Sequence, residues 1–317
     1  MKKRIISVLL ATVFALSVIG CGTKDTKEQD AYRQYGITCM ESGKYEDAVK
    51  AFQNALGESI GHIGEKELDI CFYKAKAQVL DGKTKDALAT YDAIIKYNKD
   101  ARAYYLRGDL YMDMGEEKEG RADFESAVQH GKKNYEIYIG IYESLSRHEK
   151  KDEGQKYLSA AMEIKGDKPE DELYKGRISY LLGENKDAIS YLEKAKEHKQ
   201  MLASYYLGLA YDANGDSDKA KKCIAEYIKS GVATSYDLYE LGMQEMQDGN
   251  YKNALTYFNS GLELEKVPNK QNLMKSAIAA YEYSGDFDSA KKMMKEYLKA
   301  YPDDEEAKHE NTFLETR

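Results

Sequence analysis

Residues 29–57 read QDAYRQYGITCMESGKYEDAVKAFQNALG, and the spacing of their small and large residues decides the fold. Gly43 follows Gly36 by seven residues, Ala48 lies five residues further on, and Phe52 comes four residues after that. A small residue inside one helix lets a second helix pack close against it, and a glycine between two helical segments favours the left-handed conformation that ends a helix. The stretch therefore predicts two helices joined by a tight turn.

The same spacing recurs along the chain with a period near 34 residues. Chance would not place so many of the 24 glycines at one phase, so the pattern indicates an internal repeat of about eight helical hairpins. The three prolines all fall between the repeats, where they do not interrupt a helix. The residues that correspond to Gly36 in the later copies are Ala75, Gly108, Gly140, Gly176, Gly208, Gly242 and Ile278.

This pattern resembles the tetratricopeptide repeat, and the resemblance covers about residues 29–302. It implies an all-α solenoid of about eight hairpins wound into a right-handed superhelix, whose first helices line a concave groove for an extended protein segment. Residues 303–317 are predicted to form a polar terminal helix that caps the last hairpin, as repeat arrays require. In the first copy the residues that match the family pattern are Tyr32, Gly36, Gly43, Tyr45, Ala48, Phe52 and Ala55.

Two copies depart from the family pattern. The copy assigned to Gly140 is stretched by two residues and lacks the glycine of its turn, which contains residues 146–150 (SRHEK). Glu136 and Ser204 stand where the family favours a large aromatic residue near the start of the first helix. These departures concern local packing and leave the predicted fold unchanged.

Projection of the first helices gives a set of side chains that we expect to face the groove. Aromatic residues dominate the set, with isolated cations between them, and tyrosine and arginine are common anchors of protein interfaces. The alternative is that many of these tyrosines pack in the seams between neighbouring hairpins, because one helical phase serves both positions. The candidates are Arg33, Phe72, Lys76, Tyr105, Arg177, Tyr180, Tyr205, Tyr236, Tyr239 and Tyr283.

The first 21 residues, MKKRIISVLLATVFALSVIGC, predict an export signal. Three basic residues precede an uncharged apolar run from Ile5 to Ile19. About fifteen helical residues span roughly 22 Å, which is shorter than the ~30 Å hydrocarbon core of a bilayer. The run therefore fits the core of a signal peptide better than a permanent membrane span.

The signal ends in Val18-Ile19-Gly20-Cys21, which resembles the lipobox of bacterial lipoproteins. The resemblance implies that residues 1–20 are removed, that Cys21 carries a diacylglyceryl group, and that residues 21–28 form a polar tether. Two acyl chains hold a protein firmly to a bilayer. We therefore expect an extracytoplasmic protein anchored by lipid to the cell membrane. The alternatives are an uncleaved anchor and an ordinary secretion signal.

Composition and charge exclude several other classes of protein. Hydrophobic residues make up 42% of the chain and charged residues 32%, which fits neither a disordered chain nor a protein with many membrane spans. The net charge is −8, and no basic cluster offsets it. Because an acidic surface repels the phosphate backbone, we expect no nucleic-acid partner.

The sequence shows no motif for catalysis or metal binding. The five histidines are scattered, and none has a second histidine or cysteine at metal-ligand spacing on one helix face. No nucleophile elbow and no phosphate-binding loop is present. We therefore predict no catalytic residue, no metal and no cofactor.

These observations lead to three hypotheses about function. The leading one is a lipid-anchored scaffold that binds a protein or peptide on the outer side of the bacterial cytoplasmic membrane. The second is an assembly factor for the envelope or for pili, by resemblance to repeat-containing lipoproteins. The third and least favoured is an enzyme or a receptor for a small molecule, which would need an enclosed apolar pocket with converging polar groups.

Overall fold

The computed structural model describes residues 27–59, 63–166 and 168–317, and these residues form 17 helices and no β-strand. The predicted signal peptide and the predicted lipidation site Cys21 lie outside the described residues. Helix α2 begins at Lys27, so the last two residues of the predicted tether are helical. Among the described helices, none has both the length and the apolar character needed to cross a membrane.

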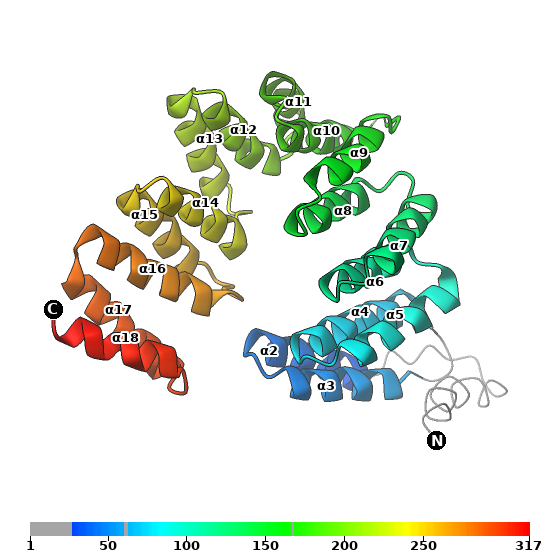
Figure 1. Ribbon diagram of the computed structural model, residues 1–317, viewed down its shortest axis with the longest axis horizontal. Coiled ribbons are helices and arrows are strands. Elements are labelled where there is room, and N and C mark those ends of the chain that lie inside the picture. Colours follow the sequence, from blue (N-terminus) through cyan, green and yellow to red (C-terminus); the bar gives the residue numbers. More distant parts are fainter. Residues whose placement is uncertain (1–26, 60–62, 167) are drawn as a thin grey trace. The chain divides into compact units, whose positions relative to one another are not determined.

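The chain divides into two compact units, with the boundary between residues 184 and 185. Within each unit, consecutive helices pack as neighbouring hairpins (Figure 1). Unit 1 contains α2 (Lys27–Glu41), α3 (Tyr45–Gly57), α4 (Glu65–Leu80), α5 (Thr84–Asn98), α6 (Ala101–Asp113), α7 (Glu117–His130), α8 (Tyr135–Arg147), α9 (Lys151–Met162) and α10 (Pro169–Leu182). Unit 2 contains α11 (Asn185–Glu197), α12 (Leu202–Ala213), α13 (Ser217–Lys229), α14 (Ser235–Gln247), α15 (Tyr251–Leu262), α16 (Lys270–Ser284), α17 (Phe287–Ala300) and α18 (Glu305–Glu315).

The prediction of an all-α helical-repeat fold is confirmed. The even-numbered helices α2 to α16 are the first helices of the predicted hairpins, and the odd-numbered helices α3 to α17 are the second. The unit boundary separates α10 from α11, which the sequence pattern assigns to one hairpin. A superhelix that spans both units stays a prediction.

The glycines of the first helices have the close-packing role that the spacing predicts. A Cβ atom at Gly36 would lie 2.6 Å from the ring of Phe52, and one at Gly242 would lie 2.3 Å from the ring of Phe258. Both rings are fully buried. In each hairpin the missing side chain therefore makes room for the large residue sixteen positions later in the second helix.

Each hydrophobic cluster draws on more than one hairpin. In the first cluster, Cys39 of α2 and Phe52 of α3 pack with Ile70 of α4. At the other end of the chain, Met294 of α17 packs with Leu314 of α18. A hairpin cannot bury its apolar face alone, so the stability of such a chain depends on the contact between neighbours.

The fourth hairpin corrects one prediction, because it is not stretched. Glu149 lies 34 residues after Gly115, and both residues end the first helix of their hairpin with a left-handed conformation, at φ values of 60° and 77°. The residue equivalent to Gly108 is therefore Tyr142, and the small residue facing it is Gly154 of α9, where a Cβ atom would lie 3.1 Å from the Cα atom of Tyr142. Gly154 is the equivalent of Ala48 in the first hairpin, so the difference in this hairpin is that a large residue, Tyr142, takes the first-helix position that Gly36 occupies there.

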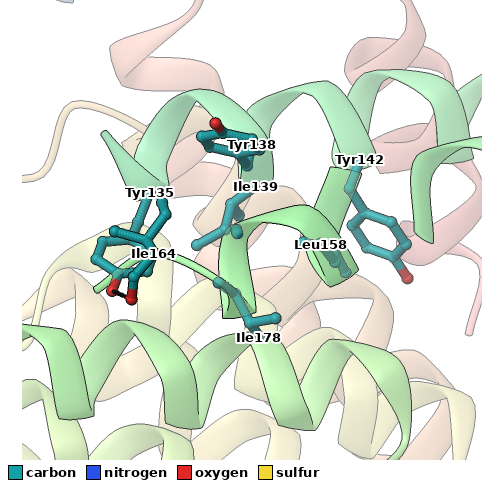
Figure 2. Packing of buried hydrophobic residues seen from close by; sticks show 8 residues of the cluster. Tyr135, Tyr138, Ile139, Tyr142, Leu158, Ile164 and Ile178 are labelled. Atoms are coloured by element: carbon teal, nitrogen blue, oxygen red, sulfur yellow. Dashed lines mark hydrogen bonds between the residues drawn. The ribbon is translucent and has the colours of Figure 1, made fainter. Parts of the chain in front are cut away.

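The corrected register also removes the departure at Glu136, because the residue equivalent to Tyr104 is Tyr138, which is aromatic and buried. Tyr135, at the start of α8, is also buried and stacks on Tyr174 of α10 with ring centroids 5.1 Å apart. Figure 2 shows Tyr135 and Ile164 side by side over Ile178, and the Tyr135 hydroxyl donates to the Ile164 carbonyl oxygen at 3.5 Å. The start of α8 thus contributes aromatic contacts both at the family position and beside it.

Helix α18 packs on the last hairpin through Ala307 and Leu314, which are both buried. Asp304 caps the helix by accepting the backbone N–H of Ala307 at 3.0 Å. Its carboxylate also accepts the Tyr297 hydroxyl at 2.5 Å and lies 2.9 Å from the Lys275 ammonium. These groups, the tyrosine hydroxyl first, lower the pKa of Asp304.

Candidate functional site

Two of the predicted groove residues are buried in seams between hairpins. Phe72 and Tyr205 are each 8% exposed and belong to hydrophobic clusters. The guanidinium carbon of Arg102 lies 3.5 Å from the centroid of the Phe72 ring and covers it. Tyr205 packs against Tyr227 of α13, with ring centroids 5.3 Å apart. These two side chains therefore act in packing and are not available to a partner.

Tyr105 has a similar position in unit 1. Its ring lies 6.3 Å from that of Phe124, and its hydroxyl end fills the space above Gly140 of α8. Burial raises the pKa of Tyr105, and the charge of Asp109 raises it further. This tyrosine joins two successive first helices, so the glycine at position 140 serves the contact with α6.

The two predicted groove arginines are already paired with carboxylates. Arg33 of α2 donates to Asp69 of α4 at 2.6 and 2.9 Å, and Arg177 of α10 donates to Glu143 of α8 at 2.9 Å. In contrast, Lys76 is exposed and has no ion pair among the described residues. On the first helices of unit 1, both predicted groove arginines are therefore neutralised by carboxylates of neighbouring hairpins.

A second group of ion pairs also joins the first helices of neighbouring hairpins in unit 1. Arg147 at the end of α8 lies 2.6 Å from Asp109 and 3.8 Å from Asp113 of α6, and His148 lies 3.0 Å from Asp113. Each of these pairs joins first helices of successive hairpins. Such exposed pairs contribute little to stability, typically about 0–1 kcal/mol each, but they occupy the charged groups that a ligand would otherwise contact.

In unit 2, helix α14 carries a partly exposed apolar stripe, which we call the α14 stripe. It consists of Tyr236, Tyr239, Met243 and Met246, at intervals that place them on one side of a helix. Tyr236 is 53% exposed, and the other three are half-buried against the cluster around Phe258. The stripe thus presents apolar and aromatic surface on a rigid helix.

The two remaining predicted groove tyrosines lie on other first helices. Tyr283, near the end of α16, is 68% exposed and stacks on Tyr251 at the start of α15, with centroids 5.4 Å apart. Tyr180 is half-buried on α10. For these tyrosines, as for the α14 stripe, contact with a partner stays a prediction.

Sequence reasoning missed a cleft on the opposite side of α14. It lies where α12, α13, α14 and α15 meet, and its volume is about 260 Å³. The backbones of α13 and α14 make few close approaches compared with α11 and α12 or α15 and α16, and the cleft lies beside this junction. Buried Ile224 and Leu241 and half-buried Leu209 form its apolar part.

The charged side chains that line this cleft are mainly acidic. Asp212 of α12 and Glu245 and Asp248 of α14 line it, together with one cation, Lys221 of α13. Tyr257 of α15 also lines it, and burial raises the pKa of this tyrosine, with a further rise from the charges of Glu245 and Asp212. The sequence feature that could have indicated this cleft is the position of Asp212 and Asp248 at helix C-termini, where the helix dipole favours basic residues.

The described residues contain no group of three histidine, cysteine, aspartate or glutamate side chains placed to hold a metal ion. This holds for the cleft as well, so its three carboxylates are not placed to share one metal ion.

Comparison with known proteins identifies the repeats. Models of the tetratricopeptide repeat match residues 74–135, 202–230 and 271–304, and the chain contains such repeats in these ranges. No curated protein sequence matches the chain.

The chain is also similar to several solved structures. A tetratricopeptide repeat protein from Parabacteroides merdae ATCC 43184 has 11% sequence identity and a TM-score of 0.47, with 80% of this chain and 99% of that chain covered. The Cut9–Hcn1 complex of the APC/C has 16% sequence identity and a TM-score of 0.44, and the match covers 98% of this chain and 62% of that chain. PilW, a type IV pilus biogenesis factor, has 18% sequence identity and a TM-score of 0.43, and the match covers 66% of this chain and 97% of that chain.

Proposed function

We propose that this chain is a scaffold that binds a segment of another protein on the first helices of its repeats, with the main contact at the α14 stripe. The observation that carries the proposal is the stripe itself. It combines an exposed tyrosine, Tyr236, with a second tyrosine and two methionines that are only half-buried. Tyrosine and methionine are enriched at protein interfaces, and methionine adapts its shape to a partner.

The contrast with unit 1 supports this assignment. There, the predicted groove cations Arg33 and Arg177 are held by carboxylates of the neighbouring hairpin, and the aromatic Phe72 is buried. A partner that bound this face would have to displace existing contacts. The α14 stripe needs no such displacement.

Photocrosslinking in cells tests the proposal. A photoreactive phenylalanine analogue in place of Tyr236 should give a discrete crosslinked protein, whereas the same analogue in place of Phe313 should not. Phe313 is a matched control because it is also exposed, at 43%, lies in unit 2 and belongs to α18 rather than α14. Tyr239→Ala with Met243→Ala should reduce the crosslink about tenfold, since central contacts dominate binding energy. Equal crosslinking from both positions would contradict the proposal.

We further propose that the scaffold is anchored by lipid at Cys21 to the outer side of the cytoplasmic membrane. The support is the apolar run of residues 5–19 followed by the lipobox-like residues 18–21. Cells grown with an alkyne-labelled fatty acid should incorporate the label into the wild-type chain and retain it in the membrane fraction. Cys21→Ser should lose the label. Incorporation of the label into the Cys21→Ser chain would rule out this residue as the acyl acceptor.

A further inference from the structure

The cleft between α12, α13, α14 and α15 is separate from the α14 stripe. Helical rotation places Leu241 and Glu245 on the side of α14 that faces the cleft, and Tyr239 and Met243 on the other side. The contacts agree with this placement, because Tyr239 and Met243 pack toward α15 and α16. The cleft therefore needs an explanation of its own.

The electrostatic field in the cleft is negative for two reasons. Asp212, Glu245 and Asp248 contribute three carboxylates against the one ammonium of Lys221. Asp212 is in the last turn of α12, and Asp248 directly follows the last residue of α14. The C-terminal end of each helix adds a partial negative charge of about −0.5. The two carboxylates thus add to the negative ends of the helix dipoles, where basic residues would be the favourable type.

In unit 1, an acidic residue at the C-terminal end of a first helix lies beside basic residues of the next hairpin. Asp113, the last residue of α6, is matched by Arg147 and His148 from the next first helix. In unit 2, Asp212 and Asp248 have no ion-pair partner among the described residues. Lys221, the one cation of the cleft lining, is exposed and is likewise without an ion pair among them. The charged side chains that line the cleft therefore carry a net negative charge, with three carboxylates against one ammonium.

The shape of the cleft selects an organic cation over a metal ion. The three carboxylates are not grouped as metal ligands. The apolar part formed by Leu209, Ile224 and Leu241 suits an aliphatic stem, and Tyr257 adds an aromatic side chain to the lining. A volume of about 260 Å³ is at the lower limit for ligand pockets and fits one long side chain rather than a larger molecule.

We infer that this cleft binds a guanidinium or ammonium group carried on an aliphatic stem, as in the side chain of arginine or lysine. Asp212 and Asp248 pair with the cationic head, Glu245 is held in place by the side-chain amide of Asn253 at 3.1 Å, and the apolar residues contact the stem. The ligand can be a basic residue of a bound protein or a free basic amino acid. The inference does not depend on the α14 stripe.

Saturation-transfer NMR on the full-length protein in detergent tests the inference with small probes. The probes are N-acetyl-arginine amide, N-acetyl-lysine amide, free L-arginine, and N-acetyl-citrulline amide, which is a neutral isostere of the first. We expect dissociation constants of about 1 mM for the arginine amide and at least tenfold weaker binding for the citrulline amide. Stronger binding of the amide than of free arginine identifies a peptide residue as the natural ligand, and the reverse identifies a free amino acid.

Two double variants provide the matched comparison. Asp212→Asn with Asp248→Asn should weaken binding of the arginine amide about tenfold, because the cation loses both charged acceptors. Asp218→Asn with Glu240→Gln removes the same charge from exposed positions of α13 and α14 outside the cleft, and should leave binding unchanged. Equal binding of the arginine and citrulline amides, or equal losses in the two double variants, would overturn the inference. Because no protein partner is used, the result is independent of the crosslinking at Tyr236.

Discussion

Replacement of Glu149 by glycine should stabilise unit 1, and the structure allows the size of the effect to be worked out. Glu149 ends α8 in a left-handed conformation with φ of 60°, at the position where Gly115 ends α6 with φ of 77°. The backbone bonds of the two turns correspond: Lys150 N–H donates to the Leu145 carbonyl at 2.8 Å, and the equivalent bond after Gly115 is 2.9 Å. The turn is therefore the same, and only the residue type differs.

The free-energy change has two opposing parts. A side chain in the left-handed region costs roughly 1–2 kcal/mol, and glycine removes this cost. Glycine also has more freedom in the unfolded chain, which offsets roughly 0.5–1 kcal/mol of the gain. The Glu149 side chain is exposed and makes no ion pair with a described residue, so no contact is lost. The net expectation for Glu149→Gly is a stabilisation of about 1 kcal/mol.

Urea unfolding followed by far-ultraviolet circular dichroism gives the assay. With a slope of about 2 kcal/mol per molar urea, the midpoint for unit 1 should rise by about 0.5 M. Glu149→Ala is the control, because it removes the same carboxylate but keeps a Cβ atom in the left-handed region. Amide hydrogen exchange in α8 and α9 should slow in the glycine variant alone. If alanine and glycine raised the midpoint equally, the effect would come from charge, and the conformational reasoning would be refuted.

Three further changes test other parts of the structure. Gly242→Ala places a methyl group against the buried Phe258 ring, so it should destabilise unit 2 by about 1–3 kcal/mol in the same urea assay, and an unchanged midpoint would contradict the close packing. Arg107→Leu leaves the buried Asp123 carboxylate without its two guanidinium bonds of 2.6 and 2.7 Å, and we expect a loss of about 3 kcal/mol that Asp123→Asn in the same chain partly restores. Glu282 of α16 has its pKa raised from 4.5 to about 7, first by burial and then by a carboxylate of α18. Because the folded state holds the proton of Glu282 more tightly than the unfolded state does, the packing of α18 should be most stable below pH 4.5 and should weaken as pH rises through 7. Hydrogen exchange in α18 should show this pH dependence in the wild type and not in Glu282→Gln.

The helical hairpins were predictable from the sequence because their main determinant is local. The small residue at Gly36 and the turn at Gly43 act within about twenty residues of each other, and the period repeats the signal. The error at Gly140 has a physical origin. This glycine does pack closely, but against Tyr105 of the preceding hairpin, whereas Gly154 provides the close contact within its own hairpin. A glycine shows that something approaches closely without showing which element approaches.

The assignment of groove residues could not be made from sequence for a different reason. Whether an aromatic side chain is buried depends on the residue that the next hairpin brings to it. Arg102 covers Phe72 from the following first helix, whereas Tyr236 stays 53% exposed. These contacts join hairpins, so they depend on the rotation between neighbours, which the helical period alone does not determine.

Charge pairing between hairpins has a consequence for where this chain binds. In unit 1 a cation on one first helix pairs with a carboxylate on the next, as Arg33 pairs with Asp69. These charged groups therefore have their partners within the folded chain. In unit 2 the α14 stripe is part-exposed, and no ion pair within the described part of the chain includes Asp212 or Asp248. A ligand gains most where it replaces only water, because displaced protein contacts subtract from its binding energy. We therefore expect unit 2 to contribute more to binding than unit 1, although both are built from the same repeat.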